Sequence, residues 1–461
     1  MLTAGAVAAA VGGKLVGGDA SRTIAGFSID SRTLASGDLF FVIRGERFDG
    51  HVFVADAIRA GAAGVVISDP TAAPVAEGTA IVLVDDTIRA LQALGSHVRS
   101  VSGTKVVAVT GSAGKSTTKE IAAEFLSARY QVFRNKGNLN NHIGLPLSLL
   151  ELRRRPDIAV VEFGMNHFGE IRTLVGIAQP DVRVWTNVGP AHLEFFGTVD
   201  AVAEAKAEIL EGAGREHVLI ANADDERVMA HARRFAGHVV TFGLERPADV
   251  RAVAVRDRGI DGMSARVRTP VGQGEVDTPL AGIGNLANLL AATAVALRFD
   301  VPLGDVLARA ATLKPVSHRG EVIRAGRVTI LDDSYNSNPA ALSRALAVMK
   351  GESRFARRIA VIGEMLELGE GSIGLHRESG EEAASSDLSA LVTVGGAPAR
   401  ALAEAAVSAG MSRDAVFYVE DSARAASLLL DIVKPGDLVL VKGSRGVRVE
   451  VVVARLRAEL N

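Results

Sequence analysis

Cysteine is absent from this chain of 461 residues, and aromatic residues make up only 4% of it. The lack of cysteine excludes disulfides, thiolate metal sites and a cysteine nucleophile, and it fits a cytoplasmic protein best. Neither sign of charge dominates, because 51 Lys and Arg face 53 Asp and Glu and the formal net charge is -2. Such a chain has no broad basic field, so we expect no nucleic-acid partner.

A membrane-spanning segment is also lacking. The longest uncharged stretch, residues 278–297, contains one proline, two glycines and two asparagines, which is untypical of a span. The first 13 residues are small and apolar, but no basic residue precedes them, so a secretory signal lacks its charged region. We expect an amphipathic first helix and no direct membrane insertion.

The length and the succession of apolar runs predict an α/β protein with three domains. Residues 1–101 alternate short strands and helices, as in a small mixed α/β domain, and residues 100–103 are interpreted as a linker. Residues 102–313 are predicted to form a central P-loop domain with a parallel sheet and appended antiparallel strands. Residues 314–461 are predicted to form a doubly wound, Rossmann-like domain. The central segments are strands at 105–110, 158–163, 182–188 and 218–222, hairpins within 250–278, and a closing helix at 285–298.

A glycine loop between a strong strand and a strong helix is the most specific local motif. It reads TGSAGKSTT from Thr110 to Thr118. Glycines there let backbone N–H groups approach phosphate oxygens, Lys115 would reach the outer phosphates, and the Ser116 hydroxyl suits Mg²⁺. Val109 stands where the usual P-loop has its first glycine. The sequence predicts ATP or GTP as ligand, rather than an incidental glycine-rich turn. The predicted nucleotide-binding residues of the loop are Gly111, Ser112, Ala113, Gly114, Lys115, Ser116 and Thr117.

Ionisable side chains follow two predicted parallel strands, at the edge where open α/β sheets bind ligands. Glu162 ends one strand and His192 follows another. A carboxylate and an imidazole there could hold Mg²⁺ alongside Ser116, although Mg²⁺ usually prefers oxygen ligands and keeps several waters. Taken alone, Glu162 fits a solvated strand-end carboxylate equally well, and a capping or packing role suits His192 better. Lys206 lies in a predicted helix among glutamates, the pattern of a salt-bridged surface lysine.

Three segments combine side-chain amides with loop or helix-start positions. The loop from residue 137 to 146 suits sugar or phosphate binding through amide donors, but it also fits a run of Asx turns. Asn285 is interpreted as an N-cap, whereas Asn288 is an unusual buried amide unless it meets a ligand. Residues 332–339 have the composition of a helix cap before a helix-starting proline, but they are unusually dense in Asp, Tyr and Asn.

Together these segments resemble the Mur ligase family, the ATP-dependent amide-forming enzymes of peptidoglycan precursor synthesis. The resemblance covers the whole chain and rests on TGSAGKSTT, GNLNNHIGLP, EFGMNHFGEI, NVGPAHLEFFGT, AEAKAEI, GNLANLLAA and IGEMLELGE, in order and spacing. Within the family, DDSYNSNP is similar to the D-S-Y-N-A-N-P signature of the members that add D-alanyl-D-alanine. The D-N-P-R motif of the members that add the third residue is absent.

The resemblance implies a role for each matched residue. It places Lys115 on the β- and γ-phosphates of ATP, Ser116 and Glu162 on one Mg²⁺, and His192 on a second. Lys206 matches a lysine that CO₂ converts into a carbamate, and this carbamate helps to hold the second Mg²⁺. The implied role replaces the interpretation of Lys206 as a salt-bridged surface lysine. The other implied contacts are adenine for Asn285 and Asn288, phosphate for Arg319, ribose for Asp333, and the UDP-linked substrate for Ser28, Asp30, Ser31, Arg32, Gly45, Asn138, Asn140, Asn141, His142 and Asn336.

The implied reaction joins D-alanyl-D-alanine to UDP-N-acetylmuramoyl-tripeptide through an acyl phosphate, with release of ADP and phosphate. These two substrates are the expected partners, and a monomer is the expected state. Two other functions stay open. One is a related ligase, either another amino-acid-adding Mur enzyme or a folylpolyglutamate-synthetase-like enzyme. The other is a P-loop ATPase switch, which would turn over ATP without an amine acceptor.

Overall fold

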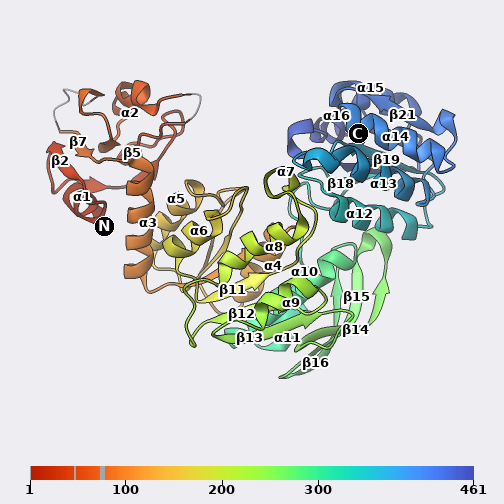
Figure 1. The fold of residues 1–461 in the computed structure, drawn as a ribbon, viewed down its shortest axis with the longest axis horizontal. Coiled ribbons are helices and arrows are strands. Elements are labelled where there is room, and N and C mark those ends of the chain that lie inside the picture. Colours follow the sequence, from red (N-terminus) through yellow and green to blue (C-terminus); the bar gives the residue numbers. More distant parts are fainter. Residues whose placement is uncertain (1, 46–47, 73–77, 461) are drawn as a thin grey trace. The chain divides into compact units, whose positions relative to one another are not determined.

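The computed structural model of the chain describes residues 2–45, 48–72 and 78–460. They form three α/β domains, each on its own sheet, which confirms the predicted fold class (Figure 1). By internal packing the chain separates into two compact units. Unit 1 comprises Met1–Ala108 and Tyr130–Asp181, and unit 2 comprises Val109–Arg129 and Val182–Asn461.

The N-terminal domain, in unit 1, is built on a five-stranded sheet. Its elements are β1 (Leu2–Thr3), α1 (Ala4–Ala10), β2 (Lys14–Gly17), β3 (Thr23–Ile24), β4 (Gly26–Ser28), β5 (Asp38–Phe41), α2 (Val54–Arg59), β6 (Gly64–Ile67), β7 (Ala80–Leu83) and α3 (Thr87–Ser102). The sheet order is β2-β7-β6-β5-β4, parallel from β4 to β7, with β2 antiparallel to β7. In α1, Ala4, Val7 and Ala8 are buried at helical spacing, which confirms an amphipathic first helix.

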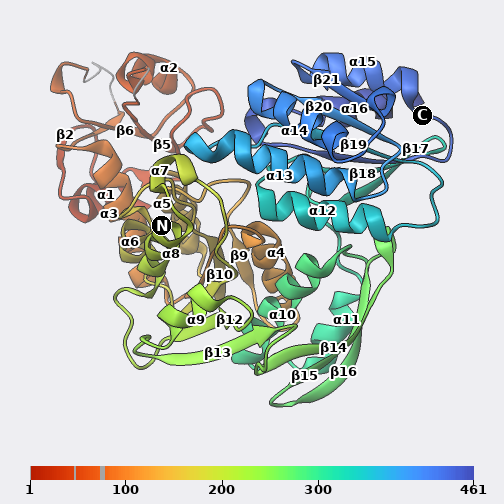
Figure 2. The ribbon, with the colours of Figure 1, turned by 45° about the vertical axis from the view of Figure 1, so that its right-hand side comes forward.

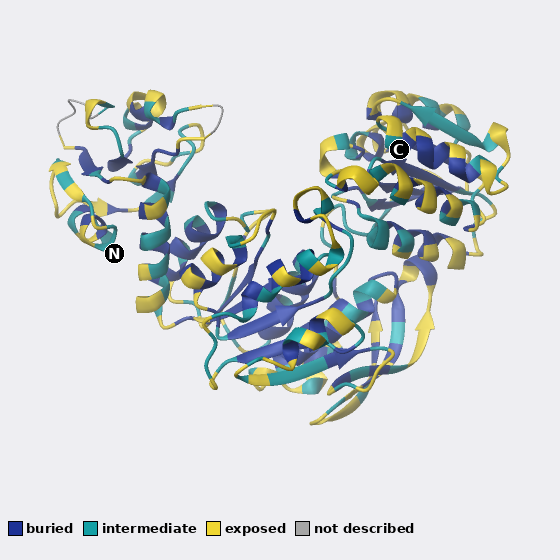
Figure 3. Ribbon diagram, in the orientation of Figure 1, coloured by how far each residue is buried: buried dark blue, intermediate teal, exposed yellow. Residues whose placement is uncertain are grey.

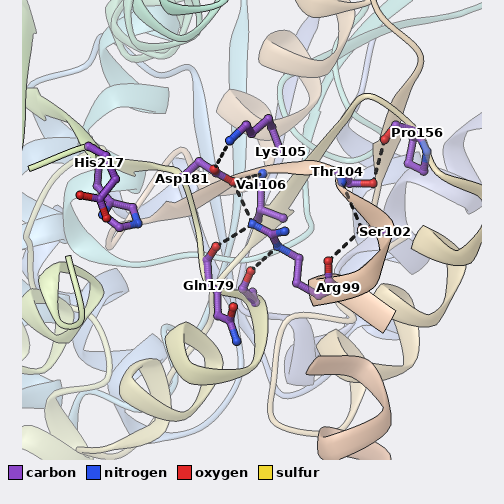
Figure 4. A network of polar contacts seen from close by, with 11 residues as sticks. Arg99, Ser102, Thr104, Lys105, Val106, Pro156, Gln179, Asp181 and His217 are labelled. Carbon is purple, nitrogen blue, oxygen red and sulfur yellow. Dashed lines mark hydrogen bonds and ion pairs between the residues drawn. The ribbon is translucent and has the colours of Figure 1, made fainter. Parts of the chain in front are cut away.

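The predicted linker at residues 100–103 is wrong, because residues 100–102 are the last turn of α3. The guanidinium of Arg99 donates to the carbonyls of Ala178 and Gln179, both at 2.9 Å, and to the Asp181 carboxylate at 2.8 Å (Figure 4). Lys105 contacts the same carboxylate at 2.9 Å. These long-range bonds hold the helix end, and a local reading of small polar residues does not reveal them.

The central sheet has nine strands in the order β16-β15-β14-β13-β12-β11-β8-β10-β9. Unit 1 contains β9 (Val132–Arg134), α5 (Gly144–Leu149), β10 (Ile158–Glu162) and α6 (Glu170–Ala178), and β8 (Lys105–Thr110) is divided between the units. Unit 2 contains α4 (Lys115–Leu126), β11 (Val182–Trp185), α7 (Leu193–Phe196), α8 (Val199–Ala207), β12 (Val218–Asn222), α9 (Glu226–Ala232), β13 (His238–Gly243), β14 (Val250–Asp257), β15 (Met263–Thr269), β16 (Gly272–Thr278), α10 (Ile283–Arg298) and α11 (Leu303–Ala310).

Within unit 2, the strand directions match the sequence pattern. Strands β11 to β14 run parallel, and β14, β15 and β16 form the predicted antiparallel hairpins. Every residue of β11 is buried, as are Val218–Ala221 of β12 (Figure 3). Helix α10 packs against α4 and the neighbouring strands. Among the described residues, no helix is long and apolar enough to cross a membrane.

The C-terminal domain, also in unit 2, has a six-stranded sheet with helices on both faces. Its elements are β17 (Glu321–Ala325), β18 (Val328–Asp333), α12 (Pro339–Gly351), β19 (Arg358–Gly363), α13 (Ser372–Ala384), β20 (Ala390–Val394), α14 (Ala397–Ser408), β21 (Val416–Val419), α15 (Ser422–Ile432), β22 (Leu438–Lys442) and α16 (Glu450–Leu460). The order is β17-β18-β22-β19-β20-β21, parallel except for β17. One cluster of buried residues includes members of α12, α13 and α14, and a second includes members of α15 and α16. Figure 2 shows α12 and α13 on one side of the strands and α15 and α16 on the other. This is the predicted doubly wound domain.

Candidate active site

The glycine loop follows β8 directly and ends where α4 begins. Gly111 and Gly114 have φ values of +151° and +83°, which residues with a side chain rarely adopt. A Cβ at Gly111 would lie 1.9 Å from Oγ1 of Thr186, and one at Gly114 would lie 2.2 Å from Oδ1 of Asn288. The loop therefore requires glycine at both positions, which explains the sequence motif physically.

The segment after β11 holds this loop from the side. Thr186 Oγ1 and Asn187 Nδ2 both donate to the carbonyl of Ala113, at 2.7 and 3.0 Å. In return, the Asn187 carbonyl accepts from the Ser112 N–H at 3.0 Å, and its Oδ1 accepts from the Ala113 N–H at 2.9 Å. Two loop N–H groups are thus engaged with Asn187, so the start of α4 is the better anion-binding position.

The first turn of α4 brings three predicted residues to this position. Lys115 folds back so that Nζ donates to the carbonyl of Gly111 at 2.8 Å. Ser116 and Thr117 follow it in the helix, and each is 8% exposed. The ammonium group therefore lies over the glycine loop.

His192, Lys206 and Lys115 come together in unit 2. His192 caps α7 with a φ of +59°, and its Nδ1 lies 2.6 Å from Oε2 of Glu367. Lys206 is only 1% exposed, so its interpretation as a surface lysine is wrong. Burial lowers the pKa of His192, the Glu367 hydrogen bond raises it, and the charges of Lys206 and Lys115 lower it further. The net pKa is below its usual value, so the imidazole is neutral at pH 7, the form that binds metals.

The two asparagines of α10 form a connected pair beside the glycine loop. The helix has Gly282 as its N-cap, so the N-cap interpretation of Asn285 is wrong. Asn285 instead donates through Nδ2 to the carbonyl of Ala281 at 2.9 Å, and its Oδ1 accepts from Asn288 Nδ2 at 3.3 Å. Asn288 is 8% exposed and accepts from the Thr118 hydroxyl at 3.3 Å. Its buried amide is therefore satisfied by protein partners.

In the C-terminal domain, Arg319 stacks on an aromatic ring. Its guanidinium carbon lies 4.0 Å from the ring centroid of Tyr335, and that of Arg445 lies 5.3 Å from the same ring. A Cβ at Gly320 would lie 3.9 Å from Nδ2 of Asn285. The corner that carries Arg319 thus approaches the asparagine pair, although the two lie far apart in the sequence.

Asp333 is held by a buried lysine from another strand. Lys442, at the end of β22, is 2% exposed, and its Nζ contacts Oδ2 of Asp333 at 2.6 Å and the carbonyl of Asn336 at 3.0 Å. The capping interpretation of this segment is confirmed at its end, where Asn338 accepts from the Ala341 N–H at 2.9 Å. The segment therefore combines a helix cap with an oriented carboxylate.

Several site residues were missed by the sequence analysis. His318 Nδ1 lies 2.7 Å from Oδ2 of the fully buried Asp332, whose other oxygen accepts from the Ser334 hydroxyl at 2.5 Å. Asn187, Glu367 and Lys442 were not singled out either. For His318 and Asp332, the only clue in the sequence was their position directly before Arg319 and Asp333. The contacts of Asn187, Glu367 and Lys442 are made with distant segments, so the sequence contained no clue to them.

In unit 1, the predicted Ser28–Arg32 segment forms a compact polar turn. The Ser28 hydroxyl donates to the carbonyl of Asp30 at 2.9 Å. Arg32 contacts both carboxylate oxygens of Asp30, at 2.8 and 2.6 Å. This pairing lowers the pKa of Asp30 to about 2. The arginine side chain is 85% exposed, so the ion pair adds little stability and stays accessible to a ligand.

The second predicted substrate segment, residues 45–51, lies partly outside the described residues, because Glu46 and Arg47 are not among them. Gly45 donates its N–H to the carbonyl of Phe48 at 2.9 Å. His51 Nδ1 lies 2.6 Å from Oδ1 of Asp49, and Nε2 accepts from the backbone of Ser68 at 3.2 Å. This histidine is held by protein partners on both ring nitrogens.

The amide-rich loop of unit 1 positions Glu162. Asn140 Nδ2 donates to Oε1 of Glu162 at 2.9 Å, and Glu162 is 4% exposed, so its interpretation as a solvated carboxylate is wrong. An Asx turn is confirmed at Asn141, whose Oδ1 accepts from the Ile143 N–H at 3.2 Å and also from the Gly144 N–H at 2.8 Å. The carbonyl of His142 accepts from Gln92 Nε2 at 3.0 Å. Asn138 completes the loop and is exposed.

A cavity of about 630 Å³ adjoins these substrate segments within unit 1. Phe27, next to Ser28, lines it on one side, and Leu139, between Asn138 and Asn140, lines it on another. Arg134, Lys136 and Arg154 add positive charge, and Glu151, which pairs with Arg154 at 3.1 Å, adds one carboxylate, so cations outnumber carboxylates in the lining. The lining therefore combines an aromatic ring with cations, the chemistry that suits an anionic organic ligand.

Sequence models of three related domains match the chain. They are the Mur ligase family catalytic domain at residues 23–132, the Mur ligase middle domain at 109–296 and the Mur ligase glutamate ligase domain at 318–445. The chain is 33% identical over 434 residues to a UDP-N-acetylmuramoyl-tripeptide–D-alanyl-D-alanine ligase of Bacillus subtilis, with 94% of this chain and 93% of the relative covered. It is 34% identical to the protein of the same name from Escherichia coli, with 96% of both covered.

The three-dimensional structure of the chain is similar to two solved structures. A crystal structure of MurF from Acinetobacter baumannii has a TM-score of 0.89 at 32% identity and covers 99% of both chains. A MurF ligase from Thermotoga maritima in complex with ADP has a TM-score of 0.82 at 31% identity, with 95% of this chain and 98% of that chain covered. Both similarities extend over all three domains.

Proposed function

The chain belongs to the Mur ligase family, and on that premise we propose that it joins D-alanyl-D-alanine to UDP-N-acetylmuramoyl-tripeptide with ATP. The observation that carries the proposal is the glycine loop between β8 and α4, over which Lys115 Nζ is held by the Gly111 carbonyl at 2.8 Å, with the charges of Lys115 and the buried Lys206 acting on His192 in the same unit. Such a site stabilises negative charge on phosphate oxygens. The names of the full-length relatives supply the two substrates.

In the proposed reaction, a carboxylate oxygen of the tripeptide attacks the γ-phosphorus of ATP, the bond from that phosphorus to the β–γ bridging oxygen breaks, and ADP leaves. The amine of D-alanyl-D-alanine then attacks the acyl carbon. The bond between that carbon and the phosphate oxygen breaks, phosphate leaves and the amine gives up a proton. Lys115, held over the loop by the Gly111 carbonyl, stabilises charge on the outer phosphates.

The nucleotide is proposed to lie between the glycine loop and the corner of the C-terminal domain that approaches α10. Asn285 and Asn288 would contact adenine, Asp333 the ribose, and Arg319 a phosphate. Support comes from the closeness of Gly320 to Asn285 and from the bond that orients the Asp333 carboxylate. The remaining loop contacts would come from Gly111, Ser112, Ala113, Gly114, Ser116 and Thr117.

One Mg²⁺ would be held by the Ser116 hydroxyl and the Glu162 carboxylate, and a second by the His192 imidazole and a carbamate on Lys206. When bound, these ions would supply positive charge to the phosphate oxygens. The hydroxyl and the buried carboxylate are oxygen ligands of the kind that Mg²⁺ prefers, and the neutral imidazole adds a nitrogen lone pair, a less usual ligand for this cation. An unmodified Lys206 does not fit, because an ammonium group repels a cation, so the carbamate is part of the proposal. Over residues 2–45, 48–72 and 78–460, no three His, Asp or Glu side chains form a cluster suited to a metal, so phosphate oxygens and water would complete the coordination.

The UDP-linked substrate is proposed to bind unit 1 along the two substrate segments and the amide-rich loop. The exposed Asp30–Arg32 pair and the cationic cavity beside Phe27 support binding of an anionic nucleotide there. The contacting residues would be Ser28, Asp30, Ser31, Arg32, Gly45, Asn138, Asn140, Asn141 and His142, with Asn336 in unit 2. We further propose a cytoplasmic monomer with domains at residues 1–101, 102–313 and 314–461.

Phosphate release from ATP and Mg²⁺ in the presence of UDP-N-acetylmuramoyl-tripeptide tests this proposal. The acceptor is D-alanyl-D-alanine, a series of single amino acids, or nothing. Release that depends on the dipeptide is expected. Release only with a single amino acid would indicate another branch of the family, and release indifferent to the acceptor would indicate an ATPase.

A further inference from the structure

We propose that Glu367 is a positioning residue for His192: its carboxylate accepts a hydrogen bond from Nδ1–H and so leaves Nε2 unprotonated and able to bind the proposed magnesium ion. This inference rests on the proposed function for the identity of the metal. Its physical basis is the contact of 2.6 Å between His192 Nδ1 and Glu367 Oε2. Glu367 lies 175 residues further along the chain, in the loop after β19.

A neutral imidazole carries a single proton, and the hydrogen bond made by one ring nitrogen decides which form the other takes. A carboxylate is a strong acceptor, since hydrogen bonds to an ionised group are short and about twice as strong as neutral ones. Acceptance at Nδ1 therefore fixes Nε2 as the nitrogen with a free lone pair. Without such an acceptor, the Nε2–H form, which is the commoner one in free histidine, has a proton where a metal would bind.

The backbone around the contact shows that the two loops are docked and do not merely touch through one pair of side chains. The Glu194 N–H donates to the carbonyl of Glu367 at 3.0 Å. A Cβ at Gly369 would lie 3.0 Å from Cα of Glu194. Both partners of the pair also have left-handed backbones, with φ of +59° at His192 and +62° at Glu367. Such conformations persist only where the surrounding structure enforces them, and they concentrate at functional sites.

The loop that carries Glu367 is held from behind by two further side chains. The fully buried His376 accepts through Nε2 from the Met365 N–H at 2.9 Å, and the Ser444 hydroxyl accepts from the Leu366 N–H at 2.9 Å. A carboxylate on an anchored loop holds its partner in one orientation, as an orienting residue must.

The competing explanation is that Glu367 only attaches the loop to α7. The two roles differ in what happens to the ring protons. In ¹⁵N NMR of the full chain at pH 7.5, the signals of His192 identify its tautomer. The chain has 10 histidines, so comparison with a His192→Gln variant assigns them. We expect the Nδ1–H form in the wild type. The Nε2–H form in the wild type would overturn the proposal without any need for a variant at Glu367.

Variants then separate positioning from attachment. Glu367→Gln keeps an acceptor oxygen and should preserve the Nδ1–H form, whereas Glu367→Ala should convert it to Nε2–H. The matched control is Glu370→Gln in the same loop, which is exposed and should change nothing. If Glu367→Ala keeps the wild-type tautomer of His192, Glu367 only attaches the loop to α7 and the positioning role is refuted.

Metal affinity supplies a second readout that does not involve catalysis. Mn²⁺ binding to the chain with a non-hydrolysable ATP analogue, followed by electron paramagnetic resonance, should weaken about 10- to 100-fold in Glu367→Ala. It should recover in Glu367→Gln. Equal affinity in all variants would contradict the role of Glu367. Neither the tautomer nor the Mn²⁺ affinity requires turnover. If the expected tautomer is found but the chain shows no ligase activity, the proposed function is refuted and the positioning role of Glu367 stands.

Discussion

Replacing Gly114 by alanine should disrupt the glycine loop more than the backbone conformation alone explains. An L residue at a φ of +83° costs about 1–2 kcal/mol. The new Cβ would also lie 2.2 Å from Oδ1 of Asn288, so the amide must move by about 1 Å to reach ordinary contact. That movement breaks the bonds of Asn288 to Thr118 and Asn285, each about 0.5–1.5 kcal/mol. We therefore expect a total destabilisation of about 2–5 kcal/mol.

Differential scanning calorimetry measures this effect. For a cooperative unit of about 200 residues, each kcal/mol lowers the melting temperature by about 2–4 °C. The control is Gly212→Ala, which has a φ of +64° and no atom within 4 Å of the added Cβ, so it carries the backbone cost alone. In Gly114→Ala, calorimetric titration should also show weaker ATP binding. Equal melting temperatures for the two variants, or unchanged ATP binding in Gly114→Ala, would refute the steric argument.

Three further substitutions test other parts of the structure. Lys442→Met removes the buried partner of Asp333 and should destabilise unit 2 by about 3 kcal/mol and raise the KM for ATP, measured by calorimetry and by initial rates. Asp181→Asn should lower the melting temperature of unit 1 by the equivalent of about 2–4 kcal/mol, because Asp181 binds both Arg99 and Lys105. Burial lowers the pKa of His376 in the folded chain below its value in the unfolded chain. As the pH falls below about 6.5, the unfolded chain therefore takes up a proton at this position before the folded chain does, and the wild type loses stability. His376→Gln lacks this effect, so its melting temperature should depend less on pH between 7.5 and 5, and parallel curves would contradict the assignment.

The sequence predicted those parts of the fold that depend on local pattern. In α4, Ile121, Ala122, Phe125 and Leu126 are all buried, as their helical spacing indicated. The β-branched run of β8 is a buried strand for the same reason. Glycine positions in the loop were predictable too, because only glycine tolerates those backbone angles and contacts.

The predictions that were wrong concern residues whose environment is set by contacts between distant segments. Lys206 has the neighbours of a surface lysine, and its burial follows only from the packing around α8. Residues 100–102 have the composition of a linker, but they are helical beside the tightly bound Arg99. Glu367 was part of a recognised motif, yet only the fold brings it to His192. Local pattern thus identified the glycine loop between β8 and α4, whereas the orientation of its surrounding side chains required the structure.

The central claim is that this chain forms an amide through an acyl phosphate. The most direct measurement uses UDP-N-acetylmuramoyl-tripeptide with ¹⁸O in its terminal carboxylate, together with ATP, Mg²⁺ and D-alanyl-D-alanine, followed by mass spectrometry of both products. The account predicts a joined product with the mass of the labelled tripeptide substrate plus the dipeptide less one H₂¹⁸O. The ¹⁸O that is lost is found in the released phosphate, and the other carboxylate ¹⁸O stays in the new amide carbonyl. Phosphate without ¹⁸O, or phosphate release without the joined product, would contradict it.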